Sequence, residues 1–89
     1  MLLEYYMIIA RSVTYAQRIE RVLRRAGIRA VLFRAPLELT GGAGCSYAVR
    51  VSAEAGSSAM RILRTSGLDA VRILKIDGNR ATEVLYDLL

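Results

Sequence analysis

The chain has one strong nucleophile, the thiol of Cys45. Its 89 residues include no histidine, so the commonest general base and the commonest metal ligand are both missing. One cysteine and eight scattered carboxylates make a poor zinc site. We therefore expect no metal, no cofactor and no self-sufficient catalytic centre, and we predict that the chain is not an enzyme.

Two predicted strands with a helix between them precede this cysteine. Residues 5–10 form an apolar run of strand length. Thr14 and Gln17 fit a capping box that starts a helix, and Gly27 is typical of the position just after one. Residues 29–35 predict the second strand. Between the capping box and Gly27, apolar residues recur at helical spacing, at Ala16, Ile19, Leu23 and Ala26.

A similar pattern follows Pro36, which cannot donate to a strand ladder and should end the second strand. A glycine-containing loop leads to the alternating segment 45–51, which predicts a third strand. Ser52 is suited to cap a second helix that runs to about Ser66 and ends at Gly67.

The last elements complete an internal repeat. Residues 70–76 predict a fourth strand, residues 77–79 a turn, and residues 80–89 a short C-terminal helix or tail. We expect one α+β domain over residues 1–89, a ferredoxin-like βαββαβ sandwich whose core spans residues 1–79, with a four-stranded antiparallel sheet and both helices on one face. The residues that recur 40 positions apart are Ser12 and Ser52, Leu23-Arg24 and Leu63-Arg64, Gly27 and Gly67, and Ala30-Val31 and Ala70-Val71.

This topology predicts that Cys45 lies beside the start of the first helix. The first two strands run in the same direction, so the loop after the second strand reaches the edge where the first helix begins. Unpaired N–H groups and the helix dipole stabilise an anion there, and we expect a lowered pKa for the thiol. The opposing interpretation is that Cys45 is an ordinary small apolar residue in a half-buried strand. The residues expected to stabilise a thiolate or bind an anion are Arg11, Ser12, Thr14, Arg34 and Gly44.

The segment around the cysteine resembles a known family. A proline-containing loop, Ala35-Pro36-Leu37-Glu38-Leu39-Thr40, leads to the strand Gly44-Cys45-Ser46-Tyr47-Ala48-Val49-Arg50-Val51. Together with the preceding strand and arginine-rich helix, this pattern is similar to the family called putative Se/S carrier protein-like. In that family one cysteine heads a strand of the form Cys-Gly-apolar-Ala-apolar-Arg-apolar.

The resemblance implies that Cys45 carries sulfur or selenium as a persulfide or selenosulfide, and that the partner is a cysteine desulfurase or a selenium-metabolism protein. The chain departs from the family pattern at two positions. Leu37 stands where the family has Arg, which removes a cation that would hold an anionic adduct. Ser46 stands where the family has Gly, which changes access to the thiol.

The basic composition leaves an RNA-binding interpretation open. The net charge is +5 and the pI is about 10.0, which suits RNA or an acidic protein. RNA-binding sheets stack bases on exposed aromatic residues. The alternation predicts that Tyr47 faces the helices and that one of Tyr5 and Tyr6 faces outward. Arg34 and Arg50 are the candidate cations of the outer face.

A regulatory or assembly module is the third interpretation. Two copies would form a homo-oligomer through the open sheet face or through edge strands. On the first helix Arg18, Arg21 and Arg25 form a stripe that suits an acidic partner. One cysteine cannot form an internal disulfide, and residues 1–10 have no basic leader and are too short to cross a bilayer. We expect a cytoplasmic protein without membrane contact.

Overall fold

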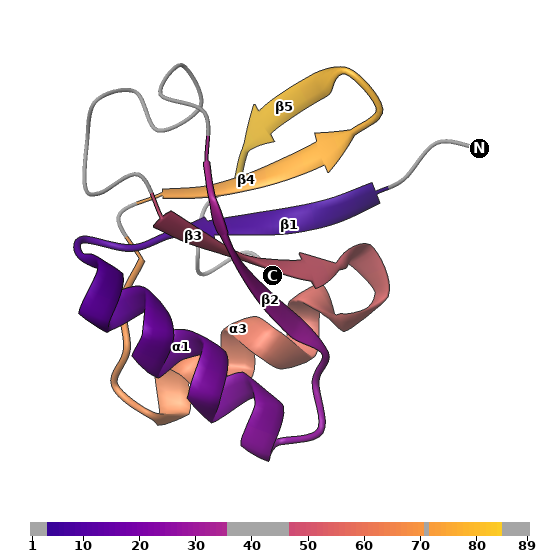
Figure 1. The fold of residues 1–89 in the computed structure, drawn as a ribbon. Helices are drawn as coiled ribbons and strands as arrows, with labels where there is room; N and C mark the ends of the chain where they lie inside the picture. Colours follow the sequence, from indigo (N-terminus) through magenta and orange to yellow (C-terminus); the bar gives the residue numbers. More distant parts are fainter. Residues whose placement is uncertain (1–3, 36–46, 71, 85–89) are drawn as a thin grey trace.

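The computed structural model describes residues 4–35, 47–70 and 72–84, which form one sheet and a layer of helices. Both helices, α1 and α3, lie on the same side of the sheet (Figure 1). The strands are β1 Glu4–Ile9, β2 Ala30–Arg34, β3 Tyr47–Ser52, β4 Arg72–Asp77 and β5 Arg80–Glu83. The helical segments are α1 Val13–Arg25, the short 3₁₀ helix η1 Ala53–Ala55 and α3 Gly56–Thr65.

The sheet is antiparallel, and its strand order is β2-β3-β1-β4-β5. The α+β class is confirmed, whereas the predicted strand count of four is wrong because the described sheet has five strands. Residues 80–83, predicted as part of a helix or tail, form β5 instead. The turn at residues 78–79, with Gly78 at φ +61°, brings Arg80 opposite Asp77. This tight turn pairs residues 80–83 with β4, so they extend the sheet.

Helix α1 begins two residues earlier than the capping box predicts, because Ser12 is its cap. Ser12 is extended, with φ −156° and ψ 163°, and its side chain accepts a hydrogen bond from the Tyr15 N–H at 3.1 Å. Thr14 already lies inside the helix, so the predicted capping box of Thr14 and Gln17 is wrong. The hydroxyl that precedes the first helical residue makes the cap, since the N–H groups of the first turn point toward it.

Both helices end in the same way, as the internal repeat predicts. Gly27 has φ +86° and its N–H donates to the Arg24 carbonyl at 3.0 Å, and the following N–H of Ile28 donates to Leu23 at 3.0 Å. Gly67 has φ +71° and donates to Arg64 at 3.1 Å, while Leu68 donates to Leu63 at 2.9 Å. Glycine adopts this left-handed conformation without the cost that a Cβ atom brings.

The second helix starts differently from the first. Ser52 precedes the 3₁₀ helix η1 but makes no side-chain cap, so its predicted capping role is wrong. Helix α3 follows directly at Gly56, where a Cβ atom would overlap Cε2 and Cδ2 of the Tyr6 ring. Glycine at this position therefore allows α3 to pack closely against β1.

The sheet carries an apolar cluster on each face. The larger one lies between the sheet and the helices and includes Tyr6, Ile8 and Val49 together with residues of α1 and α3. The other cluster lies on the opposite face and includes Met7, Ile9, Ala35, Ala48, Leu74 and Ile76, with Tyr5 and Phe33 packed against it. In the described part of the chain, no helix is long and apolar enough to cross a membrane.

Candidate functional site

The strand register brings the ends of β1 and β2 to one edge of the sheet. Ile9 of β1 and Phe33 of β2 both pair with Ala48 of β3, from opposite sides. Arg34, the last residue of β2, and Arg11, two residues after β1, therefore both lie at the edge of the sheet where β3 begins. Both arginines are exposed. Two of the predicted anion-binding cations thus lie at the same edge, which we call the β3-start edge.

The first turn of α1 lies at this edge and contains no acidic residue. The guanidinium of Arg11 lies 4.6 Å from the centroid of the Tyr15 ring. The Tyr15 hydroxyl accepts a hydrogen bond from the N–H of Asp69 at 2.8 Å, which ties the start of α1 to the segment after α3. Thr14 is exposed on the same turn, and the Ser12 hydroxyl is used by the helix cap. The positive end of the helix dipole is therefore not neutralised by a carboxylate of its own first turn.

Cys45 and Gly44 lie outside the described residues, so their predicted roles stay predictions. The described part of β3 starts at Tyr47. Tyr47 packs against the cluster under the helices, together with Val49 and Val51, as the alternation predicts.

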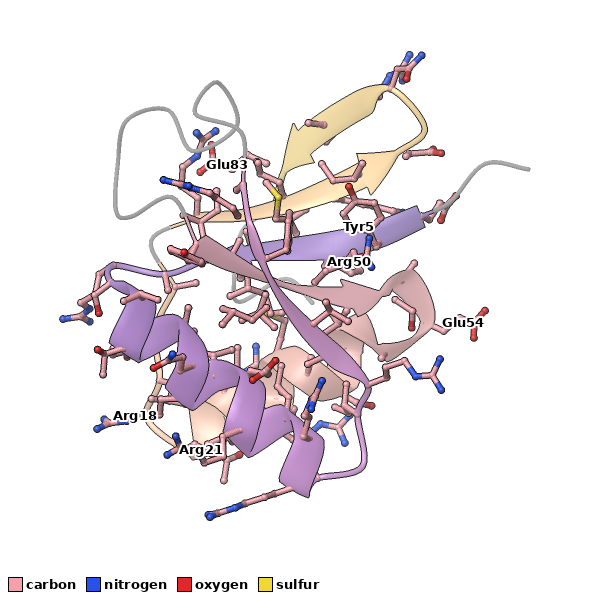
Figure 2. All side chains as sticks on the ribbon, viewed as in Figure 1. Tyr5, Arg18, Arg21, Arg50, Glu54 and Glu83 are labelled. Atoms are coloured by element: carbon pink, nitrogen blue, oxygen red, sulfur yellow. The ribbon has the colours of Figure 1, made fainter. Side chains whose placement is uncertain are left out.

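The arginine stripe on α1 is exposed, as expected for a surface that meets solvent or a partner. Arg18, Arg21 and Arg25 are all exposed, and Arg18 and Arg21 point away from the sheet (Figure 2). A shallow groove of about 560 Å³ runs along this helix and is lined by Gln17, Glu20, Arg21, Arg24 and Arg25. Two of the three predicted partner-binding residues line the groove, and Arg18 does not.

Two side chains of α1 cover the outer edge of β2 instead of facing a partner. The N–H of Leu32 donates to Glu20 Oε2 at 3.3 Å, and Arg24 Nε donates to the carbonyl of Ala30 at 3.1 Å. Glu20 and Arg24 also lie 3.8 Å apart as an ion pair. Since β2 is an outer strand of the sheet, these contacts occupy backbone groups that another strand would need for pairing. No sequence pattern indicates this role for Glu20 and Arg24.

On the face away from the helices, an arginine lies between two aromatic rings. The Arg50 guanidinium is 5.4 Å from the Tyr5 ring centroid and 6.0 Å from that of Phe33. Tyr5 is the outward-facing tyrosine of β1, while Tyr6 is buried under the helices. Arg34 does not share this face with Arg50, because Arg34 pairs with Tyr47, whose side chain points to the helices. The prediction that both arginines lie on the outer face is therefore wrong.

The second ring, Phe33, is a functional candidate that sequence reasoning missed. Val31 and Phe33 are two residues apart on β2, so the sequence predicts that they share a face of the sheet. The sequence does not predict which of the two faces this is. Among residues 4–35, 47–70 and 72–84, no group of three or more His, Cys, Asp or Glu lies close enough to hold a metal ion.

The fold and the β3-start edge define a small α+β protein with a basic edge next to a helix start. A family model described as Putative Se/S carrier protein-like matches residues 5–75, and the chain belongs to this family. The resemblance seen in the sequence is thereby confirmed. A search of curated proteins found no match, and a search of solved structures found none either.

Proposed function

We propose that the protein is a non-enzymatic carrier that holds sulfur or selenium on the thiol of Cys45. Membership of the carrier-like family is the observation that carries the proposal. The described geometry at the β3-start edge supports it, where the described part of β3 begins at Tyr47. The exposed Arg11 and Arg34 and the start of α1 lie at this same edge.

The transfer consists of two thiol exchanges. The Cys45 thiolate attacks the outer sulfur of a donor persulfide, R–S–SH; the donor S–S bond breaks, R–S⁻ leaves, and Cys45–S–SH forms. An acceptor thiolate then attacks that outer sulfur and Cys45 leaves as a thiolate. A selenium atom in the outer position follows the same steps. With one cysteine in the chain, no internal thiol can release the cargo, so the acceptor must do so.

We assign the donor role to a cysteine desulfurase, or a selenium-metabolism protein, in a cytoplasm that keeps thiols reduced. The exposed stripe Arg18, Arg21 and Arg25 supports a docking surface for an acidic face of that partner. A charge reversal, Arg21→Glu, should then slow labelling at low salt more than Arg61→Glu, a reversal on the exposed surface of α3. Equal rates would remove the stripe from the proposal.

We also assign the first four strands and the two helices to a ferredoxin-like sandwich, to which β5 adds a fifth strand beside β4. The order β2-β3-β1-β4 with antiparallel neighbours supports this assignment.

The decisive experiment uses a cysteine desulfurase and ³⁵S-cysteine. The wild-type chain should acquire label that dithiothreitol removes, and Cys45→Ser should acquire none. Titration of the thiol by its ultraviolet absorbance should give a pKa below the usual value of about 8.5. Equal labelling of both chains would overturn the carrier role, whereas a normal thiol pKa would overturn only its electrostatic activation.

A further inference from the structure

A second candidate site lies on the sheet face opposite the helices. A pocket of about 550 Å³ is lined by Glu4, Tyr5, Arg29, Val31, Arg50 and Ser52, from β1, β2, β3 and the residue before β2. This volume lies within the range of about 300–1,000 Å³ that is usual for small-molecule sites. Tyr5 and Arg50 lie side by side on neighbouring strands (Figure 2). The pocket uses no residue of the proposed carrier site.

The charge of this pocket is positive. Arg29 and Arg50 are exposed, and neither forms an ion pair within the described part of the chain. The carboxylate of Glu4, the acid of the lining, lies 3.9 Å from Lys75 Nζ and is offset by that ammonium. Two guanidinium groups that pair with no carboxylate of residues 4–35, 47–70 or 72–84 favour an anion that accepts several hydrogen bonds. Phosphate has the matching geometry.

The wall of the pocket is aromatic and apolar. The Tyr5 ring and the Val31 side chain line it, and the Phe33 ring lies beyond Arg50. The two rings near the Arg50 guanidinium favour the cation at this position. A planar base can stack on such a surface, and base stacking on aromatic rings is worth about 1–3 kcal/mol per base.

We propose that this pocket binds a nucleoside phosphate, with its phosphate at Arg29 and Arg50 and its base against Tyr5. The Ser52 hydroxyl, also in the lining, can donate a hydrogen bond to the phosphate or ribose. The same chemistry has two sources, a free nucleotide or one nucleotide unit of a single-stranded RNA. Cations beside a stacking ring are the common requirement of both.

The test measures fluorescence anisotropy of a 5′-fluorescein-labelled octamer of riboadenylate, with the full chain and at several salt concentrations. Wild type should bind, and Arg50→Gln and Arg29→Gln should each weaken binding about tenfold. Each should also reduce the slope of log affinity against log salt by about 0.7, the value for one lost phosphate contact on a single strand. Arg61→Gln, which removes the same charge from the exposed surface of α3, should change the affinity less than twofold.

Arg29 makes no ring contact in the described structure, so Arg29→Gln tests the site even if Arg50→Gln disturbs folding.

Competition by adenosine 5′-monophosphate distinguishes the two sources. If the mononucleotide displaces the octamer with an affinity close to that of the octamer, the ligand is a free nucleotide; if it displaces the octamer only weakly, the ligand is RNA. Both results support the site. Equal weakening by all three variants, no binding by wild type, or dimerisation through this face by light scattering would overturn it. Cys45→Ser should bind as wild type does, so failure here and failure of the carrier proposal are distinguishable.

Discussion

The two faces of the sheet are built from the same strands but differ in what they meet. On the helix side, Tyr6 and Ile8 of β1 are buried against α1 and α3 in a filled core. On the other side, Met7 and Ile9 are buried near the middle of the sheet, while Tyr5 borders an open, positively charged pocket. Alternate residues of one strand therefore serve packing and surface chemistry separately, because side chains point to opposite faces with a period of two.

The largest expected difference between the faces is in stability, tested at two adjacent tyrosines. Tyr6→Ala should lower the free energy of unfolding by about 3–5 kcal/mol, because it leaves a cavity in the closed core. Tyr5→Ala should cost about 1 kcal/mol, since its ring is half-buried beside a pocket. Urea denaturation measures both values. Equal losses would show that the two faces are packed alike.

The close contact between the helix layer and β1 is the next test. Gly56→Ala should destabilise the fold by about 1–3 kcal/mol, because the new Cβ atom overlaps the Tyr6 ring. In a Tyr6→Leu background the same change should cost clearly less. Gly27→Ala is the control: nothing lies within 4 Å of its Cβ position, so its cost comes from the positive φ and should not depend on Tyr6. An unchanged Gly56→Ala cost in both backgrounds would contradict this explanation.

A smaller effect is expected at the start of α1, the helix that covers part of this face. Ser12→Ala removes the side-chain cap and should cost about 1 kcal/mol. Thr14→Ala removes an exposed hydroxyl inside the helix and should change stability by less than about 0.5 kcal/mol. Thermal denaturation of the pair distinguishes the two cap positions. A larger loss for Thr14→Ala would restore the capping box.

A loss of stability similar to that of Ser12→Ala should accompany a change in association. Glu20→Ala removes the carboxylate that accepts from the Leu32 N–H at the outer edge of β2. We expect a loss of about 0.5–1.5 kcal/mol and concentration-dependent self-association in light scattering, because an uncovered edge can pair with another strand. Glu54→Ala, which removes an exposed acid from η1, is the charge-matched control. If both variants stay in the wild-type state, the edge is not protected by α1.

Much of the local structure was determined by the sequence. The β1 strand, the apolar stripe of α1 and the two glycine helix ends follow from periods of two and 3.6 and from the need for positive φ at Gly27 and Gly67. The family also followed from local signals, since the proline loop and the strand that begins at Cys45 carry its pattern in consecutive residues.

Tertiary structure decided which face each strand residue meets and which edge each side chain covers. Alternation alone placed Val31 and Phe33 on a common face, but only the pairing of Val31 with Arg50 brought them beside Tyr5 and away from the helices. The cover over β2 likewise depends on a contact between Glu20 of α1 and Leu32 of β2, which are 12 residues apart. The fifth strand instead pairs with its neighbour β4 through a local hairpin. A period-two pattern is the same when the strand is turned over, so it does not determine which set of side chains faces the helices. The burial of one face against α1 and α3 determines this.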